Sequence, residues 1–232
     1  DGDKFTIASS IGPTGDTLFL AAGRSNVSSA AVVGDHHLIG VMGAGSADSY
    51  WPPQGKRADV DLDEFRYASN TAVLEAVDAI GLVSADFSFV HFNEPDTVSH
   101  IHGPDADETK LRVKETDEAL GELIERLKPN WEDTVAIIVS DHDQELVVEY
   151  GFDLVGSLRE RGLPGLVEYE GTAAVVRSGP ALNELLRIGE IEGALALDDM
   201  HNLVWGKQGV VFGPWLDGLS GSHGSPRCDT QV

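Results

Sequence analysis

Residues 87–104 read FSFVHFNEPDTVSHIHGP, and this stretch decides the fold class. Its first six residues form an apolar run that predicts a buried strand. Asp96 and His100 follow, four residues apart, a spacing that puts both side chains on one face of a helical turn. A carboxylate with an imidazole suits zinc or another first-row metal. A candidate metal site therefore begins where a strand ends, the usual place for a ligand in an open parallel sheet.

Outward from this stretch, short apolar runs alternate with longer amphipathic ones. We expect strands at residues 5–9, 29–33, 87–92, 135–140 and 210–212, one more within 169–177, and helices at 62–82, 107–127 and 153–162. Such alternation predicts an α/β fold with a mostly parallel central sheet flanked by helices on both faces. A length of 232 residues suits one domain over residues 1–232, with truncation at either end left open.

Two further motifs carry ligand-type side chains. VSDHDQE, residues 139–145, places Asp141 and His142 directly after the β-branched run VAIIVS of residues 135–140. An ionised Asp buried at a strand end is costly unless it is paired or binds a metal. SGSHGSP, residues 220–226, holds His223 between small residues that leave it accessible. The plainer interpretations are an Asp that caps a turn and a histidine in an exposed loop.

The charge of the chain limits its partners. It has 39 acidic and 16 basic side chains, for a net charge of −23. Such a surface repels nucleic acids and anionic lipids, so we expect neither a nucleic acid nor a membrane as a partner. A small anionic substrate would need a local positive field, which bound metal cations can supply. The plainer interpretation of the charge is solubility.

The compartment is left open by the sequence. The single cysteine, Cys228, excludes an internal disulfide and a thiolate metal cluster and slightly favours a reducing cytoplasm. No apolar run approaches the roughly 20 residues of a membrane span, and no signal peptide is recognised. The oligomeric state is equally open.

In combination the motifs are far more specific than any one of them. E-P-D-x-x-x-H-x-x-G-P begins at Glu94, D-x-x-x-G begins at Asp117, S-D-H ends at His142, and G-x-H-G surrounds His223. In order and spacing this series resembles the alkaline phosphatase superfamily, and within it the nucleotide pyrophosphatase/phosphodiesterase (type I phosphodiesterase) family, over about residues 30–226.

The resemblance implies an alkaline-phosphatase-like core that binds two divalent metals, expected to be zinc. Asp96, His100 and His223 would bind one ion, and Asp141 and His142 the other. Around these ligands, or in contact with substrate, we expect three further residues: Glu94, His102 and His37. Members of the family are often exported, which adds export to the possible destinations of the chain.

The chain departs from the family pattern at its beginning. The family has an early metal-binding Asp and a Thr or Ser nucleophile. Asp1, Thr14 and Thr17 do not match these positions in spacing or context. We therefore expect the nucleophile to precede residue 1, and the catalytic residue is unknown. Ser99 and Asp143 replace family glycines, at positions that bind no metal in the family.

The sequence thus predicts a metal-dependent phosphoesterase that hydrolyses phosphodiester or pyrophosphate bonds in a small phosphoester or nucleotide through a two-metal site. Two alternatives stay open. The chain could be a non-catalytic remnant that binds metal or nucleotide, because the nucleophile is not identified. It could also be a superfamily cousin such as a phosphonate hydrolase, a phosphomutase or a sulfatase.

Overall fold

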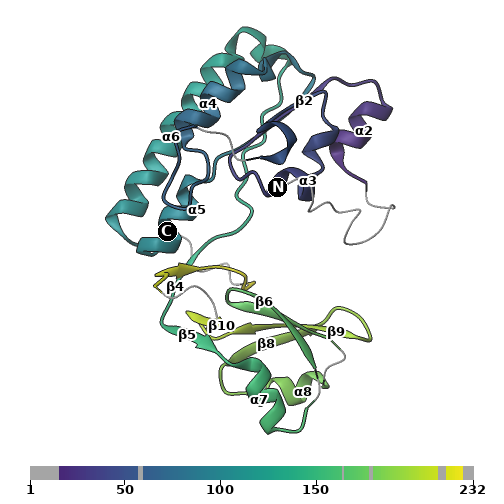
Figure 1. Cartoon of the computed structure of the whole chain (residues 1–232), viewed down its shortest axis with the longest axis vertical. Helices are drawn as coiled ribbons and strands as arrows, with labels where there is room; N and C mark the ends of the chain where they lie inside the picture. The colour runs from purple at the N-terminus through teal and green to yellow at the C-terminus, as the bar shows by residue number, and fades with distance from the viewer. Residues whose placement is uncertain (1–15, 57–59, 164, 178–179, 214–217, 227–232) are drawn as a thin grey trace. The chain divides into compact units, whose positions relative to one another are not determined.

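The computed structural model describes residues 16–56, 60–163, 165–177, 180–213 and 218–226. The strand expected at residues 5–9, Thr14 and Cys228 lie outside them. The described residues form two compact units (Figure 1). The first contains those up to Thr97 together with Leu111–Ile137, and the second contains Val98–Lys110 and those from Ile138 onward. Within this part of the chain, no helix has the length and apolar character needed to cross a bilayer.

A parallel sheet forms the centre of the first unit. Its strands are β1 (Ser29–Val33), β2 (Ser49–Trp51) and β3 (Phe87–His91), in the order β2-β1-β3, and both pairings are parallel. The central strand β1 is buried along its whole length. Successive side chains of a strand point to opposite faces, so each face of β1 needs its own apolar cover.

Helices supply this cover on both faces. α4 (Asn70–Ala79) and α6 (Asp107–Leu127) belong to the core cluster that contains Ala30 and Val32 of β1. α2 (Leu18–Arg24) and α3 (Leu38–Met42) belong to the region of the core around Ala31 and Val33. Short 3-10 helices span Ala44–Ser46, Pro53–Gly55, Leu82–Ser84 and Lys128–Asp133. The predicted α/β class, with a parallel sheet and helices, is confirmed.

The helix expected at residues 62–82 is shorter than predicted, for a local reason. The Asp63 carboxylate accepts hydrogen bonds from the amides of Phe65, at 3.0 Å, and Tyr67, at 2.8 Å, and so folds residues 63–67 into a turn. α4 begins only after Ser69, whose hydroxyl accepts from the Ala72 amide at 3.2 Å as an N-cap.

The second unit is built mainly on antiparallel strands. β6 (Leu166–Glu170), β7 (Ala173–Arg177), β8 (Ile191–Ala196) and β9 (His201–Gly206) form a sheet in the order β6-β7-β9-β8. β5 (Glu149–Phe152) pairs with β10 (Val210–Phe212), and β4 (Glu145–Leu146) pairs with β11 (Gly221–Ser222). α7 (Leu154–Glu160) and α8 (Leu182–Leu185) accompany this sheet (Figure 1). Their side chains Leu154, Leu158 and Leu185 belong to one core cluster with Ala174 and Val204 of the sheet. Sequence analysis missed this antiparallel sheet apart from β7.

The strand predicted at residues 135–140 is wrong. In the structure this run is neither helix nor strand, and the Val135 side chain is 87% exposed. A β-branched run becomes a central strand only where other strands pair with it. Among the described strands, the sheet order β2-β1-β3 ends at β3 and contains no partner for this run. The segment therefore has the composition of a strand but pairs with none of the described strands.

Val135→Ser tests directly whether residues 135–140 form a buried strand or an exposed segment. Because the side chain is exposed, we expect the free energy of unfolding to change by less than about 0.5 kcal/mol. The same substitution at Val32, which is 0% exposed in β1, should cost more than about 2 kcal/mol because it buries a hydroxyl and leaves a cavity. Urea unfolding of both variants measures the contrast. If Val135→Ser lowered the free energy of unfolding as much as Val32→Ser is expected to, residues 135–140 would be a buried strand after all.

Candidate metal centre

The first candidate ligands lie on α5 (Glu94–His102), directly after β3. The Asn93 side-chain amide donates to the Thr97 hydroxyl at 2.6 Å, which fixes the first turn. The helix carries acidic residues in its first turn and histidines in its last, as the helix dipole favours. Asp96 and His100 lie one turn apart on it, as their spacing predicts. Gly103, at φ 95°, ends the helix in the left-handed region.

His100 is held by the short strand β11. Its Nδ1 atom lies 2.9 Å from the Gly221 carbonyl oxygen, and its own carbonyl accepts from the Ser220 amide at 2.7 Å. A carbonyl only accepts, so Nδ1 carries the proton and the ring lone pair is on Nε2. Gly221 permits this approach, because a Cβ there would lie 2.2 Å from the Ser99 carbonyl oxygen.

His142 and His223 complete a cluster of three imidazoles. Their rings stack with centroids 3.7 Å apart and planes 16° apart, and the His223 centroid lies 5.0 Å from that of His100. His142 Nδ1 lies 3.1 Å from the Asp143 carbonyl oxygen, which again puts the proton on Nδ1 and the lone pair on Nε2. The His223 carbonyl accepts from the Thr172 amide at 2.8 Å. Two of the three rings are thus oriented by backbone carbonyls, as metal-binding histidines usually are.

The remaining predicted ligand, Asp141, lies at the edge of this cluster. Its carboxylate is exposed, accepts from the His142 amide at 3.2 Å and lies 3.7 Å from His142 Nε2. The structure therefore brings His100, His142 and His223 together, with Asp141 beside His142 and Asp96 one helical turn before His100. His102, at the end of α5, is exposed.

Glu94 has a different environment from the other residues of α5. Its side chain is only 5% exposed; it accepts from the Asn70 amide at 2.8 Å and forms an ion pair with Arg112. Burial raises the pKa of the Glu94 carboxyl, while the hydrogen bond from Asn70 and the charge of Arg112 oppose that rise. The pair connects the start of α5 to α4 and α6. Contact of Glu94 with a substrate stays a prediction.

Asp63 and Tyr67 were missed by the sequence analysis. The second carboxylate oxygen of Asp63 accepts from the Thr97 hydroxyl at 2.8 Å and from the Asn93 side-chain amide at 3.3 Å, which ties the turn at residues 63–67 to the start of α5. Burial raises the pKa of Tyr67 to about 12, with further contributions from the charges of Asp35, Asp63 and Asp96. No spacing in the sequence indicates that these groups are neighbours.

His37, the last predicted residue, follows β1. Its Nδ1 atom lies 3.0 Å from an oxygen of Asp35, and its amide donates to the same oxygen at 2.8 Å. Its neighbour His36 is buried more deeply. Sequence analysis singled out His37 but not Asp35, which lies two residues before it.

The comparison with known families decides the classification. The sequence profile of the type I phosphodiesterase / nucleotide pyrophosphatase family matches residues 10–206. The chain belongs to this family. The predicted resemblance is therefore confirmed, and the matched range includes α5 and the Asp141-His142 pair.

Curated relatives match a shorter stretch. Bovine bis(5'-adenosyl)-triphosphatase ENPP4 is 44% identical over 59 residues, and the human protein of the same name is 41% identical over 59 residues. Each match covers 24% of this chain and 13% of the relative. The chain thus spans a small part of the length of the curated relatives it matches.

Solved structures of family members share the fold. Murine ectonucleotide pyrophosphatase / phosphodiesterase 5 (ENPP5) superposes with a TM-score of 0.58 at 15% identity, and human ENPP5 with 0.59 at 16%. An inactive murine ENPP5 variant solved in complex with AMP gives 0.59 at 15%. Each comparison covers 89% of this chain and 58% of the other. At such identities the likeness shows the fold alone.

Proposed function

We propose that the chain is a metal-dependent phosphodiesterase or nucleotide pyrophosphatase. The observation that carries the proposal is the cluster of His100, His142 and His223, drawn from three separate segments of a chain in this family. Asp96, His100 and His223 would bind one divalent ion, and Asp141 and His142 a second, with zinc as the expected metal. The substrate would be a small phosphodiester or nucleotide.

The chemistry of the donor set fits such ions. His100 and His142 each direct a protonated Nδ1 at a backbone carbonyl, so the donor atom of each ring is Nε2. Imidazole with carboxylate favours zinc over magnesium or calcium, which prefer all-oxygen sites.

The side chains have distinct tasks in this proposal. Bound ions would neutralise phosphoryl charge and polarise the scissile bond. Asp96, one turn before His100, lowers the net positive charge of such a centre. The hydrogen bonds from His100 to Gly221 and from His142 to Asp143 hold the rings in fixed orientations. The group that attacks phosphorus is not assigned among the described residues.

The test measures zinc content and turnover of bis(p-nitrophenyl) phosphate by the natural full-length protein. We expect bound zinc, and hydrolysis that is lost on chelation and restored when zinc is added back. p-Nitrophenyl phosphate, p-nitrophenyl sulfate and a p-nitrophenyl phosphonate monoester serve as competing substrates, and the diester should be preferred. Protein that binds no metal would rule out the proposal.

The other outcomes separate the remaining functions. Zinc binding without turnover of any ester would identify a non-catalytic metal-binding protein. Preference for the sulfate would indicate a sulfatase, and preference for a phosphonate monoester would indicate a phosphonate hydrolase. Each result replaces the phosphodiesterase proposal with a defined alternative.

A further inference from the structure

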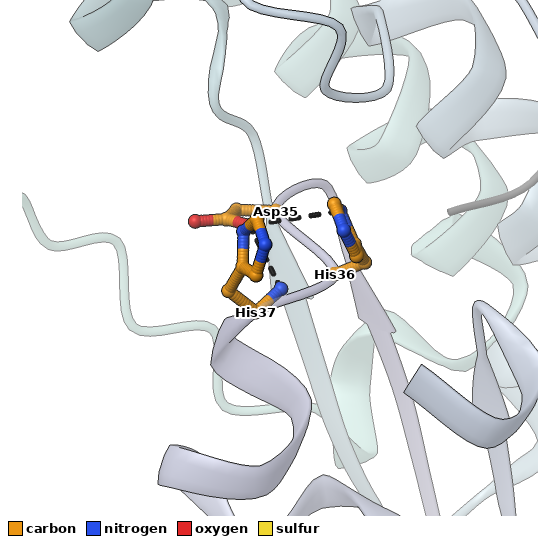
Figure 2. A group of neighbouring side chains, drawn as sticks. All are labelled: Asp35, His36 and His37. Atoms are coloured by element: carbon orange, nitrogen blue, oxygen red, sulfur yellow. Dashed lines mark hydrogen bonds and ion pairs between the residues drawn. The ribbon is translucent and has the colours of Figure 1, made fainter. Parts of the chain in front are cut away.

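A second group of metal-ligand side chains lies at the end of β1. Asp35, His36 and His37 follow this central strand after Gly34, in the first unit (Figure 2). β1 pairs with strands on both sides and is fully buried. Ligand sites in open α/β sheets lie just beyond the carboxyl ends of such strands. The group therefore occupies a favoured position for a site.

The backbone of this segment is fixed on both sides. The Gly34 amide donates to the His91 carbonyl at 3.0 Å, and the Gly34 carbonyl accepts from the Ala68 amide at 3.1 Å. The Asp35 carbonyl then accepts from the Leu38 amide at 3.1 Å, where α3 begins. A site built on this segment would be held by the sheet and the helix, and a rigid support is what precise coordination requires.

The three side chains converge. One Asp35 oxygen lies 3.0 Å from His37 Nδ1 and 3.9 Å from His36 Nδ1, and the two ring centroids are 3.9 Å apart. Figure 2 shows the carboxylate and both imidazoles gathered at the strand end. One potential donor atom from each residue lies within 4.8 Å of the others. An ion bound among them would lie about 2.0–2.2 Å from each donor atom, so the side chains would rotate toward one another on binding.

The surroundings restrict the rings further. The Tyr67 ring meets the His37 ring edge-on, with centroids 5.9 Å apart, and lies 6.1 Å from the His36 ring. The side chains of Asp35 and His36 are 16% and 14% exposed, whereas that of His37 is 47% exposed. Two ligands are thus largely enclosed, while the third faces solvent and gives an ion a route of entry.

We propose that Asp35, His36 and His37 bind one divalent first-row transition-metal ion, such as zinc or nickel. Two imidazoles and one carboxylate form a donor set for such ions, and they disfavour magnesium and calcium. Three ligands leave coordination positions for water or an anionic ligand. This site shares no residue with the centre built on His100 and His223, and it does not depend on the proposed phosphodiesterase activity.

Counting bound ions in variants of the full chain tests the site. His36→Ala/His37→Ala should bind one zinc ion fewer per chain than the unmodified protein, measured by elemental analysis after gel filtration. His100→Ala/His223→Ala should retain this ion. His201→Ala is the matched control, because His201 Nδ1 lies 2.8 Å from the Asp198 carboxylate and His201 belongs to neither proposed metal site. An unchanged zinc count in His36→Ala/His37→Ala would overturn the proposal.

Two further measurements do not depend on the stability of the double variant. Asp35→Asn keeps an oxygen that can accept from the His37 amide but removes the charge, so we expect at least a 10-fold loss of zinc affinity at this site. An anomalous difference map at the zinc edge, from soaked crystals of the unmodified chain, should show a peak among the three side chains. A map without that peak, or unchanged affinity in Asp35→Asn, would refute the site.

Discussion

His223→Ala is expected to lower the zinc affinity of the main centre by more than about 100-fold, because loss of a mere orienting partner of a ligand already costs about 10- to 100-fold. The substitution removes a ring that stacks on His142 and approaches His100. Competition against a chromophoric chelator measures the change. The His36→Ala/His37→Ala background restricts the titration to this centre.

The fold should tolerate this change, which makes the result interpretable. The Thr172 amide bonds to the backbone carbonyl of residue 223, and alanine retains that carbonyl. Far-UV circular dichroism should therefore match the unmodified chain. His201→Ala, on β9, should leave the zinc affinity unchanged. If His223→Ala bound zinc as tightly as its parent, the assignment of His223 as a ligand would be wrong.

The parts of the fold that the sequence predicts are those whose pattern is local. The strand at residues 29–33 is found at the predicted bounds, because five consecutive small or β-branched residues suit a strand buried on both faces. The helix at residues 107–127 is also found at its predicted bounds. Leu120 of its predicted apolar stripe meets the core, together with Leu123, whereas Val113 of that stripe is exposed.

The failures come from interactions between distant residues. The run at residues 135–140 has the composition of a strand, but its propensity does not specify a pairing partner. The antiparallel sheet of the second unit was largely missed, because the alternation in β6 covers only five residues and β8 is interrupted by a glycine. In both places the sequence pattern is weak or misleading, and the pairing of strands decides the outcome.

In the candidate site, too, the features that the sequence predicts are local, and those that it misses join distant residues. The Asp96–His100 spacing and the adjacency of Asp141 and His142 are local, and the sequence shows them directly. The stacking of His142 on His223 joins residues 81 positions apart in the chain, and only the family resemblance pointed to it. The carbonyl of Gly221 that orients His100 is even farther from it in the chain, at 121 positions, and no motif indicates the contact.

The pair formed by Glu94 and Arg112 leads to the largest stability prediction. Arg112→Ala should destabilise the chain by about 3 kcal/mol at neutral pH, because the buried Glu94 carboxylate would lose its charge partner. Burial already raises the pKa of Glu94, and removal of the Arg112 charge should raise it further. Urea unfolding at several pH values measures the decrease in the free energy of unfolding and its dependence on pH.

The sign of the pH dependence follows from protonation. The folded variant holds its proton on Glu94 more tightly than the unfolded chain does, so its stability rises as pH falls toward the folded pKa. The loss caused by Arg112→Ala should therefore be largest at pH 7 and shrink in acid. Arg126→Ala is the matched control on α6: its partner Asp78 is 61% exposed, so we expect a loss below about 1 kcal/mol. Equal losses for the two variants at pH 7 would show that burial of Glu94 is not the source of the effect.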